Sequence, residues 1–182
     1  YIPTFSDHEN RAFSQKLGLA EKTETPDPLI GSLLELLTRT ETDMTLFYRN
    51  LVDVPVEADV SDADRLDPLM VAYYVPGEMT GAIKEETLAW LTRYTDRVRE
   101  EGMDPELRKS QMNAANPKFV LRNYLAQLAI DEAEKGEGAK VDELLDVLRH
   151  PYDEQPGREI FAEKRPEWAR NRPGCSMLSC SS

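Results

Sequence analysis

Apolar residues recur at helical spacing in several stretches of the chain, and the clearest stretch follows residue 116. Asn116 can cap a helix, Pro117 suits the first helical position, and Gly136 suits the left-handed residue that ends many helices. The apolar positions between these signals are Leu121, Tyr124, Leu125, Leu128 and Ala129. Because they lie three or four residues apart, they share one face. The pattern predicts a buried helix that begins at Pro117 and ends near Gly136.

Start and stop signals predict further helices on both sides of this stretch. Ser6 opens a capping-box pattern, and Gly18 can end the helix that follows it. Asp27 is followed by proline, which is a second start signal, and either Thr42 or Asp43 can cap the next helix. The remaining predicted helices cover residues 68–75, 84–101, 104–112 and 141–148.

Two stretches lack a continuous apolar face. Residues 53–67 are acidic and contain Pro55, and we interpret them as a solvated linker. A calcium loop is disfavoured because the alternating oxygen ligands, the central glycine and the closing glutamate are missing. After Pro151 the prolines are frequent and the helical period disappears, which predicts an extended tail packed on another surface.

The complete pattern predicts an all-α fold without internal repeats. We expect about seven helices in a helical region at residues 1–150 and an irregular, proline-rich tail at residues 151–182. No useful strand alternation occurs in the sequence.

The charge and the composition of the chain disfavour several classes of binding function. The 182 residues contain 34 acidic and 22 basic side chains, for a net charge of −12, which disfavours binding to nucleic acid or an anionic membrane surface. The sequence has no phosphate-binding glycine loop and no zinc spacing. The two histidines, His8 and His150, have no catalytic partner that the sequence can place beside them, so we expect surface or capping roles.

Five short segments, in the same order along the chain, resemble conserved segments of the selenoprotein O family. They are residues 15–19 (QKLGL), 116–127 (NPKFVLRNYLAQ), 145–152 (LDVLRHPY), 165–169 (RPEWA) and 179–182 (SCSS). Residues 53–85 match least. The resemblance therefore spans most of the chain and covers its last residues.

The resemblance implies the carboxy-terminal part of a kinase-like fold. Members of the family are described as protein adenylyltransferases, which transfer AMP from ATP to Ser, Thr or Tyr hydroxyls of proteins. Their catalytic, nucleotide-binding and metal-binding residues precede the KLGL segment, so the resemblance implies none of these in this chain. We therefore expect the chain alone to be inactive, and the intact protein to use ATP and Mg²⁺. The expected partners are the upstream kinase-like domain and the protein substrates.

Cys175 and Cys180 are the redox candidates. Two readings stay open, namely exposed thiols on a tail without function, or accessible thiols that undergo disulfide exchange. By resemblance, Cys180 matches the position that is selenocysteine in some family members, which implies a regulatory disulfide with an upstream cysteine. Cys175 is the local alternative partner, although a gap of four residues is not the thioredoxin-like spacing.

Other interpretations also stay open. The chain could be a non-enzymatic helical interaction module, or a small thiol oxidoreductase that acts through its two cysteines. Arg122 and Asn123 either hold the upstream domain by hydrogen bonds or face solvent, and we favour the former. The resemblance implies a mitochondrial location for a eukaryotic source and a cytoplasmic one for a bacterial source, and the length of the tail favours the eukaryotic source.

Overall fold

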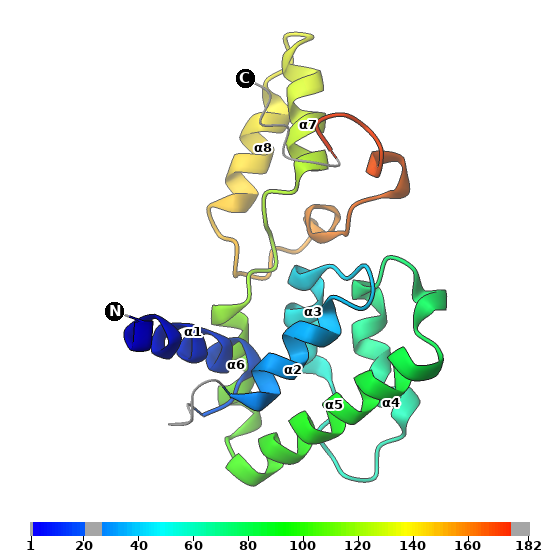
Figure 1. Ribbon diagram of the computed structural model, residues 1–182. Coiled ribbons are helices and arrows are strands. Elements are labelled where there is room, and N and C mark those ends of the chain that lie inside the picture. The colour runs from blue at the N-terminus through cyan, green and yellow to red at the C-terminus, as the bar shows by residue number, and fades with distance from the viewer. Residues whose placement is uncertain (1, 21–26, 176–182) are drawn as a thin grey trace. The chain divides into compact units, whose positions relative to one another are not determined.

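The backbone is helical throughout much of the chain that the computed structural model describes, which comprises residues 2–20 and 27–175, with side chains from residue 8 (Figure 1). Eight α-helices and no strand occur within these ranges, so the all-α prediction is confirmed. The helices are α1 Ile2–Leu17, α2 Pro28–Leu37, α3 Met44–Asn50, α4 Asp62–Leu66, α5 Gly81–Glu101, α6 Pro105–Ala115, α7 Asn123–Ala133 and α8 Ala139–Leu148. Five short 3-10 helices lie at Leu51–Asp53, Asp67–Ala72, Pro76–Glu78, Glu159–Ala162 and Glu167–Ala169.

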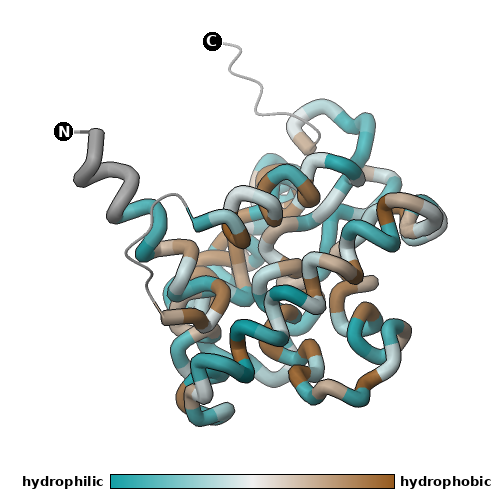
Figure 2. Tube along the Cα trace, turned by 60° about the horizontal axis from the view of Figure 1, so that its bottom comes forward, coloured by the Kyte–Doolittle hydropathy of each residue, from teal (hydrophilic) through white to brown (hydrophobic). Residues whose placement is uncertain are grey.

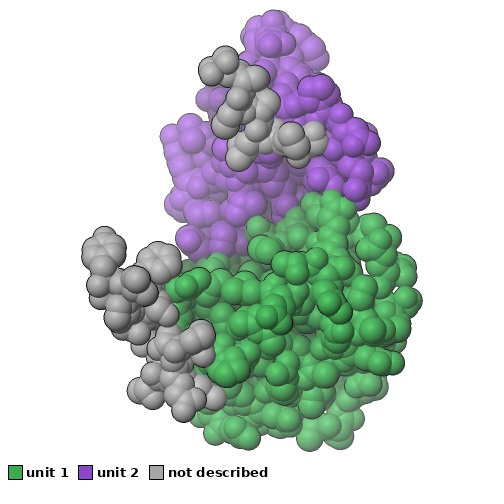
Figure 3. Space-filling view, in the orientation of Figure 1, with its two compact units in different colours: residues 1–116 green, residues 117–182 purple. Residues whose placement is uncertain are grey.

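The chain divides into two compact units, residues 1–116 and residues 117–182 (Figure 3). Each unit has its own cluster of buried apolar side chains. The predicted division at residue 150 falls inside the second unit, so residues 151–175 belong with α7 and α8 rather than apart from them.

Aromatic side chains of α3 and α5 form the centre of the first unit. Trp90 and Tyr94, one turn apart on α5, stack with 5.2 Å between ring centroids. Phe47 of α3 packs against Trp90 with a centroid separation of 6.4 Å. Trp90 Nε1 also donates a hydrogen bond of 3.0 Å to the Leu29 carbonyl of α2. Apolar and polar positions alternate along the helical parts of the trace (Figure 2), and α5 packs against α2.

Several predicted helix starts are confirmed, each with a carboxylate at the cap. Asp27 accepts from the Leu29 amide, Asp43 from the Leu46 amide and Asp104 from the Leu107 amide, at 2.9, 3.0 and 2.9 Å. Asp43, rather than Thr42, is therefore the cap of α3. Asp27 and Asp104 each precede a proline at the first helical position.

Two predictions at the amino-terminal side were wrong. Ser6 lies inside α1 and does not begin it, because the helix already starts at Ile2. The acidic stretch is not simply a solvated linker either, because Ser61 caps the short helix α4 within it. α4 buries Arg65 and Leu66 against the core, and the Arg65 guanidinium donates to the Glu57 carbonyl at 2.9 Å.

The predicted start of the most conspicuous helix was also wrong. α6 ends at Ala115 with Asn116 as its C-cap, and α7 begins only at Asn123. Asn116 is buried, and its Nδ2 donates to the Lys16 carbonyl at 2.8 Å, so this side chain is not available to cap a following helix. The amides of Lys118 and Phe119 both donate to the Pro151 carbonyl, at 2.8 and 3.0 Å, instead of entering a helix.

α7 and α8 form an antiparallel hairpin in the second unit (Figure 1). Gly136, between them, has a φ of +89°, which confirms the expected left-handed stop. On α8 the buried residues are Leu144 and Val147, whereas Val141 and Leu145, which lie at helical spacing with Leu144, are 44% and 48% exposed. The packed face of α8 is therefore rotated from the face that periodicity alone indicates.

Candidate functional site

The tail segment that precedes Cys175 is held on α7 by a small polar network. Arg172 Nη2 lies 2.5 Å from Asp131 Oδ2, and Gln127 Nε2 donates to Asp131 Oδ1 at 2.9 Å. The Gln127 hydrogen bond, followed by the Arg172 hydrogen bond, lowers the pKa of Asp131. Gly174 has a φ of +80°, which favours glycine, and a Cβ there would lie 2.1 Å from Gln127 Oε1, so the tail backbone passes close to the Gln127 side chain of α7.

Cys175, one of the two redox candidates, is buried in this arrangement. It is 4% exposed and belongs to the apolar cluster that contains Tyr124, Leu125 and Ala129 of α7. The reading in which both thiols are exposed is therefore wrong for Cys175. Its thiol is free of disulfide bonding. Cys180, the other candidate, lies outside the described residues.

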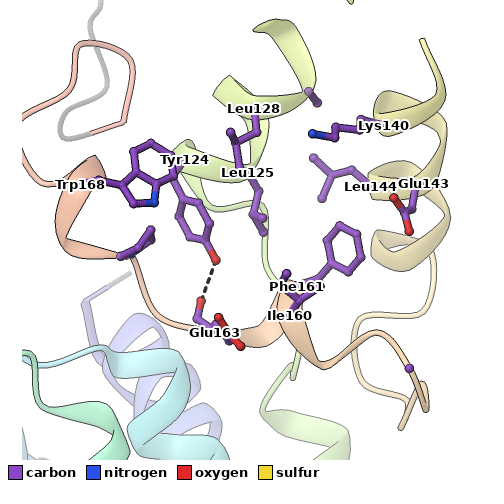
Figure 4. Close-up of a pocket in the computed structure, with 13 residues that line it drawn as sticks. Tyr124, Leu125, Leu128, Lys140, Glu143, Leu144, Ile160, Phe161, Glu163 and Trp168 are labelled. Atoms are coloured by element: carbon purple, nitrogen blue, oxygen red, sulfur yellow. Dashed lines mark hydrogen bonds between the residues drawn. The ribbon is translucent and has the colours of Figure 1, made fainter. Parts of the chain in front are cut away.

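A pocket of about 410 Å³ lies between α7, α8 and the irregular segment at residues 157–168. Its wall consists mainly of apolar and aromatic side chains, which come from all three segments (Figure 4): Tyr124, Leu125, Leu128, Leu144, Ile160, Phe161 and Trp168. The rings of Tyr124 and Trp168 meet edge to face at 6.3 Å. The Tyr124 hydroxyl donates to the Glu163 carbonyl at 3.1 Å, which ties α7 to the irregular segment.

Three charged side chains also line the pocket, namely Lys140, Glu143 and Glu163 (Figure 4). Arg158 Nη1 lies 3.6 Å from Glu143 Oε1, a distance at which the two charges attract. The pocket can therefore hold an apolar group beside charged ones. Phe161 and Trp168 follow Pro151, where the helical period is absent, so no periodic signal in the sequence indicates that they face α7 and α8.

The other candidate residues do not assemble into a catalytic centre. His8 is exposed, and His150 Nδ1 lies 3.5 Å from Asp153 Oδ2 on the surface. Arg122 is the residue at the N-cap of α7, and Asn123 is its first residue. Among the side chains that the structure describes, no group of three or more His, Cys, Asp or Glu could hold a metal ion. None of the described helices is long and apolar enough to cross a membrane.

By its fold, the chain belongs to the class of all-α proteins without repeats. Its irregular tail carries a buried cysteine and borders an apolar pocket. The family model for protein adenylyltransferase SelO matches residues 1–149. The chain therefore belongs to the SelO family, and the resemblance noted in the sequence is confirmed. The all-α structure is consistent with the carboxy-terminal part of the kinase-like fold of that family.

Individual relatives agree with the family assignment. The chain is 50% identical to a protein nucleotidyltransferase YdiU of Aromatoleum aromaticum, an alignment that covers 100% of the chain and 34% of the relative. It is 50% identical to a protein of the same name from Rhodopirellula baltica, covering 100% of the chain and 35% of the relative. The chain spans about a third of the length of these curated relatives. Both relatives are bacterial and lend no support to the mitochondrial expectation.

Proposed function

We propose that this chain is the carboxy-terminal helical part of a protein adenylyltransferase, which transfers AMP from ATP to Ser, Thr or Tyr hydroxyls of proteins. The observation that carries the proposal is the 50% identity, over the full length of the chain, to a protein nucleotidyltransferase about three times as long. An identity at this level across both compact units supports a shared architecture and a shared role.

The proposed role of these residues is to support a kinase-like core rather than to perform the transfer. The catalytic, ATP-binding and metal-binding groups are proposed to lie upstream, as the family resemblance implies, because the chain covers only about a third of the length of its relatives. The proposed partners are that upstream domain and the proteins whose hydroxyls are modified.

An AMP-transfer assay tests this division of labour. The 182-residue chain and a version extended through the upstream coding sequence are each incubated with ATP labelled in its α-phosphate, Mg²⁺ and a mixture of candidate proteins. We expect label on protein only with the extended version. Transfer by the chain alone would overturn the proposed division, and its absence from both would count against the activity itself.

We also propose that Cys180 regulates the intact enzyme through a disulfide with an upstream cysteine. With glutathione disulfide as oxidant, the two thiols lose two protons and two electrons, one S–S bond forms, and the oxidant becomes two glutathione thiols. Non-reducing mass mapping should find Cys180 in the bridge, and reduction should change the rate of AMP transfer. A free Cys180, together with a rate that ignores the reductant, would remove this proposal.

Cys175 serves as the matched control for the redox experiment. Its burial disfavours the local Cys175–Cys180 pair, because disulfide exchange requires access to the sulfur. We therefore expect Cys175→Ser to retain the response to reductant and Cys180→Ser to lose it. Loss of the response in both variants would favour a local pair and with it the small thiol oxidoreductase.

A further inference from the structure

The pocket of the second unit has an open apolar mouth. Leu125 and Leu144 are buried in its wall, whereas Ile160 and Trp168, also part of its lining, are 62% and 51% exposed. Its volume of about 410 Å³ lies within the range of ligand pockets, roughly 300–1,000 Å³. Exposed apolar side chains of this size beside a cavity mark a surface that binds a partner.

The polar groups of the pocket indicate the chemistry of that partner. The Tyr124 hydroxyl already donates its proton to the Glu163 carbonyl, so it is not a free donor for a ligand. The Glu163 carboxylate, by contrast, has no hydrogen bond or ion pair with any described residue. Lys140 supplies the one ammonium group among the described lining residues, against the two carboxylates of Glu143 and Glu163.

The hairpin beside the pocket adds to this negative charge. Residues 131–148 contain seven carboxylates and two lysines, a net charge of −5, which Arg158 and Arg172 of the neighbouring segment reduce to −3 by their ion pairs with Glu143, Asp146 and Asp131. An acidic rim attracts a basic partner and speeds its association. The same argument disfavours a second copy of this chain as the occupant, because its net charge is −12.

We propose that this pocket docks a peptide segment of a partner protein that presents an apolar side chain followed by a lysine or arginine. The apolar side chain enters between α7, α8 and Phe161, and the basic side chain lies near the Glu163 carboxylate at the mouth. The proposal goes beyond AMP transfer, and binding is measured in the absence of ATP, so its failure is distinct from a failure of the proposed function.

The test uses the 182-residue chain and a fluorescein-labelled peptide with one leucine followed by two lysines in a glycine–serine background. Fluorescence anisotropy should give a saturable isotherm. We expect Ile160→Ser to weaken binding about tenfold, because apolar contact at the mouth is lost. Glu163→Gln should weaken it about threefold and reduce its salt dependence.

Two variants outside the pocket provide matched controls. Ile130 is 48% exposed but does not line the pocket, and neither does Glu134, which is also exposed. Ile130→Ser and Glu134→Gln should therefore bind the peptide as the unchanged chain does. Equal weakening by Ile160→Ser and Ile130→Ser would overturn the proposal.

Variants of the peptide test its two proposed features. Replacing its leucine by serine should abolish binding, and replacing its lysines by glutamates should weaken binding at least about tenfold. The proposal is overturned if the unchanged chain gives no saturable binding, or if the glutamate peptide binds as tightly as the lysine peptide. It is also overturned if the chain forms a dimer that Ile160→Ser dissociates, since a second copy would then occupy the pocket.

Discussion

At the scale of single residues, Gly18 shows how a backbone conformation and a packing contact can require the same amino acid. Its φ is +63°, and a Cβ would lie 2.7 Å from Met112 Cγ and 2.8 Å from Arg108 Cγ. The preceding carbonyl, that of Leu17, accepts a hydrogen bond of 2.9 Å from the Tyr94 hydroxyl. The end of α1 is therefore fixed closely against α5 and α6.

We predict that Gly18→Ala lowers the free energy of unfolding by roughly 1–3 kcal/mol, because it adds backbone strain and overlaps with Met112. Gly31, inside α2, is the matched control, because a Cβ added there would have no neighbouring side chain within 4 Å. Gly31→Ala should raise stability by roughly 0.5–1 kcal/mol through helix propensity. Urea unfolding measures both, and equal effects of the two changes would contradict the role of Gly18.

Buried tyrosines predict a loss of stability at alkaline pH. Burial raises the pKa of Tyr48, Tyr73 and Tyr94 to about 12, from an ordinary value of 10.0. The folded state therefore holds these protons more tightly than the unfolded state. Their contribution is complete below pH 10 and decreases as pH rises from 10 to about 12. Urea unfolding at a series of pH values measures the decrease.

Tyr48→Phe tests the assignment of this alkaline loss. Within the described residues the Tyr48 hydroxyl is buried without a hydrogen-bond partner, so its removal should cost little at neutral pH. Between pH 10 and about 12, where Tyr48 titrates, the variant should lose less stability than the unchanged chain. An identical pH profile for the two proteins would show that Tyr48 does not contribute.

At the scale of helices and their connections, a capping carboxylate contributes more to the free energy of unfolding where it also forms a buried ion pair. Asp104 caps α6 at an exposed site. Asp27 caps α2 and, in addition, pairs with the buried guanidinium of Arg97. Arg97 also donates to Glu101 at 2.8 Å and to the Ala20 carbonyl at 2.9 Å.

We predict that Asp104→Ala lowers the free energy of unfolding by about 1 kcal/mol, the usual cost of a lost N-cap. Asp27→Ala should cost roughly 3–5 kcal/mol, because it removes a cap and one partner of a buried charge pair. Chemical denaturation of the two variants under one condition provides the comparison. Equal losses would mean that the buried pair with Arg97 adds nothing to the cap.

Connections were predicted less accurately than helices, and the segment after Asn116 shows why. Asn116 followed by proline has the local chemistry of a helix start, and the structure uses the same asparagine to bind the Lys16 carbonyl. That partner lies 100 residues away in the sequence, so local pattern cannot reveal it. At Asp27 and Asp104, by contrast, the side chain accepts a hydrogen bond from an amide of the helix that it begins, and these starts agree with the prediction.

At the scale of the whole molecule, the two compact units contain separate apolar clusters. Leu33 is fully buried in the first cluster, and Leu144 is 7% exposed in the second. Cys175 belongs to the second cluster, so its thiol reports on the opening of that unit. The access of a reagent to this thiol can therefore show whether the units open independently.

We predict that Leu144→Ala accelerates alkylation of Cys175 at least about tenfold, because a cavity in the second cluster destabilises its closed state by roughly 2–5 kcal/mol. Leu33→Ala, a truncation of the same size in the first unit, should leave the rate unchanged. Peptide mass mapping separates Cys175 from Cys180. Equal acceleration by both variants would indicate that the units open together.

The sequence alone is enough to predict the all-α class, the family and the helix starts at residues 27 and 104, because helical period and capping depend on residues only a few positions apart. It leaves Thr42 and Asp43 as alternatives, and the structure selects Asp43. Only the tertiary structure decided which face of α8 is buried, that Cys175 is inaccessible, and that a pocket exists beside α7. These features depend on how residues 151–175 pack on two helices, and such contacts between distant positions leave no periodic signal in the sequence.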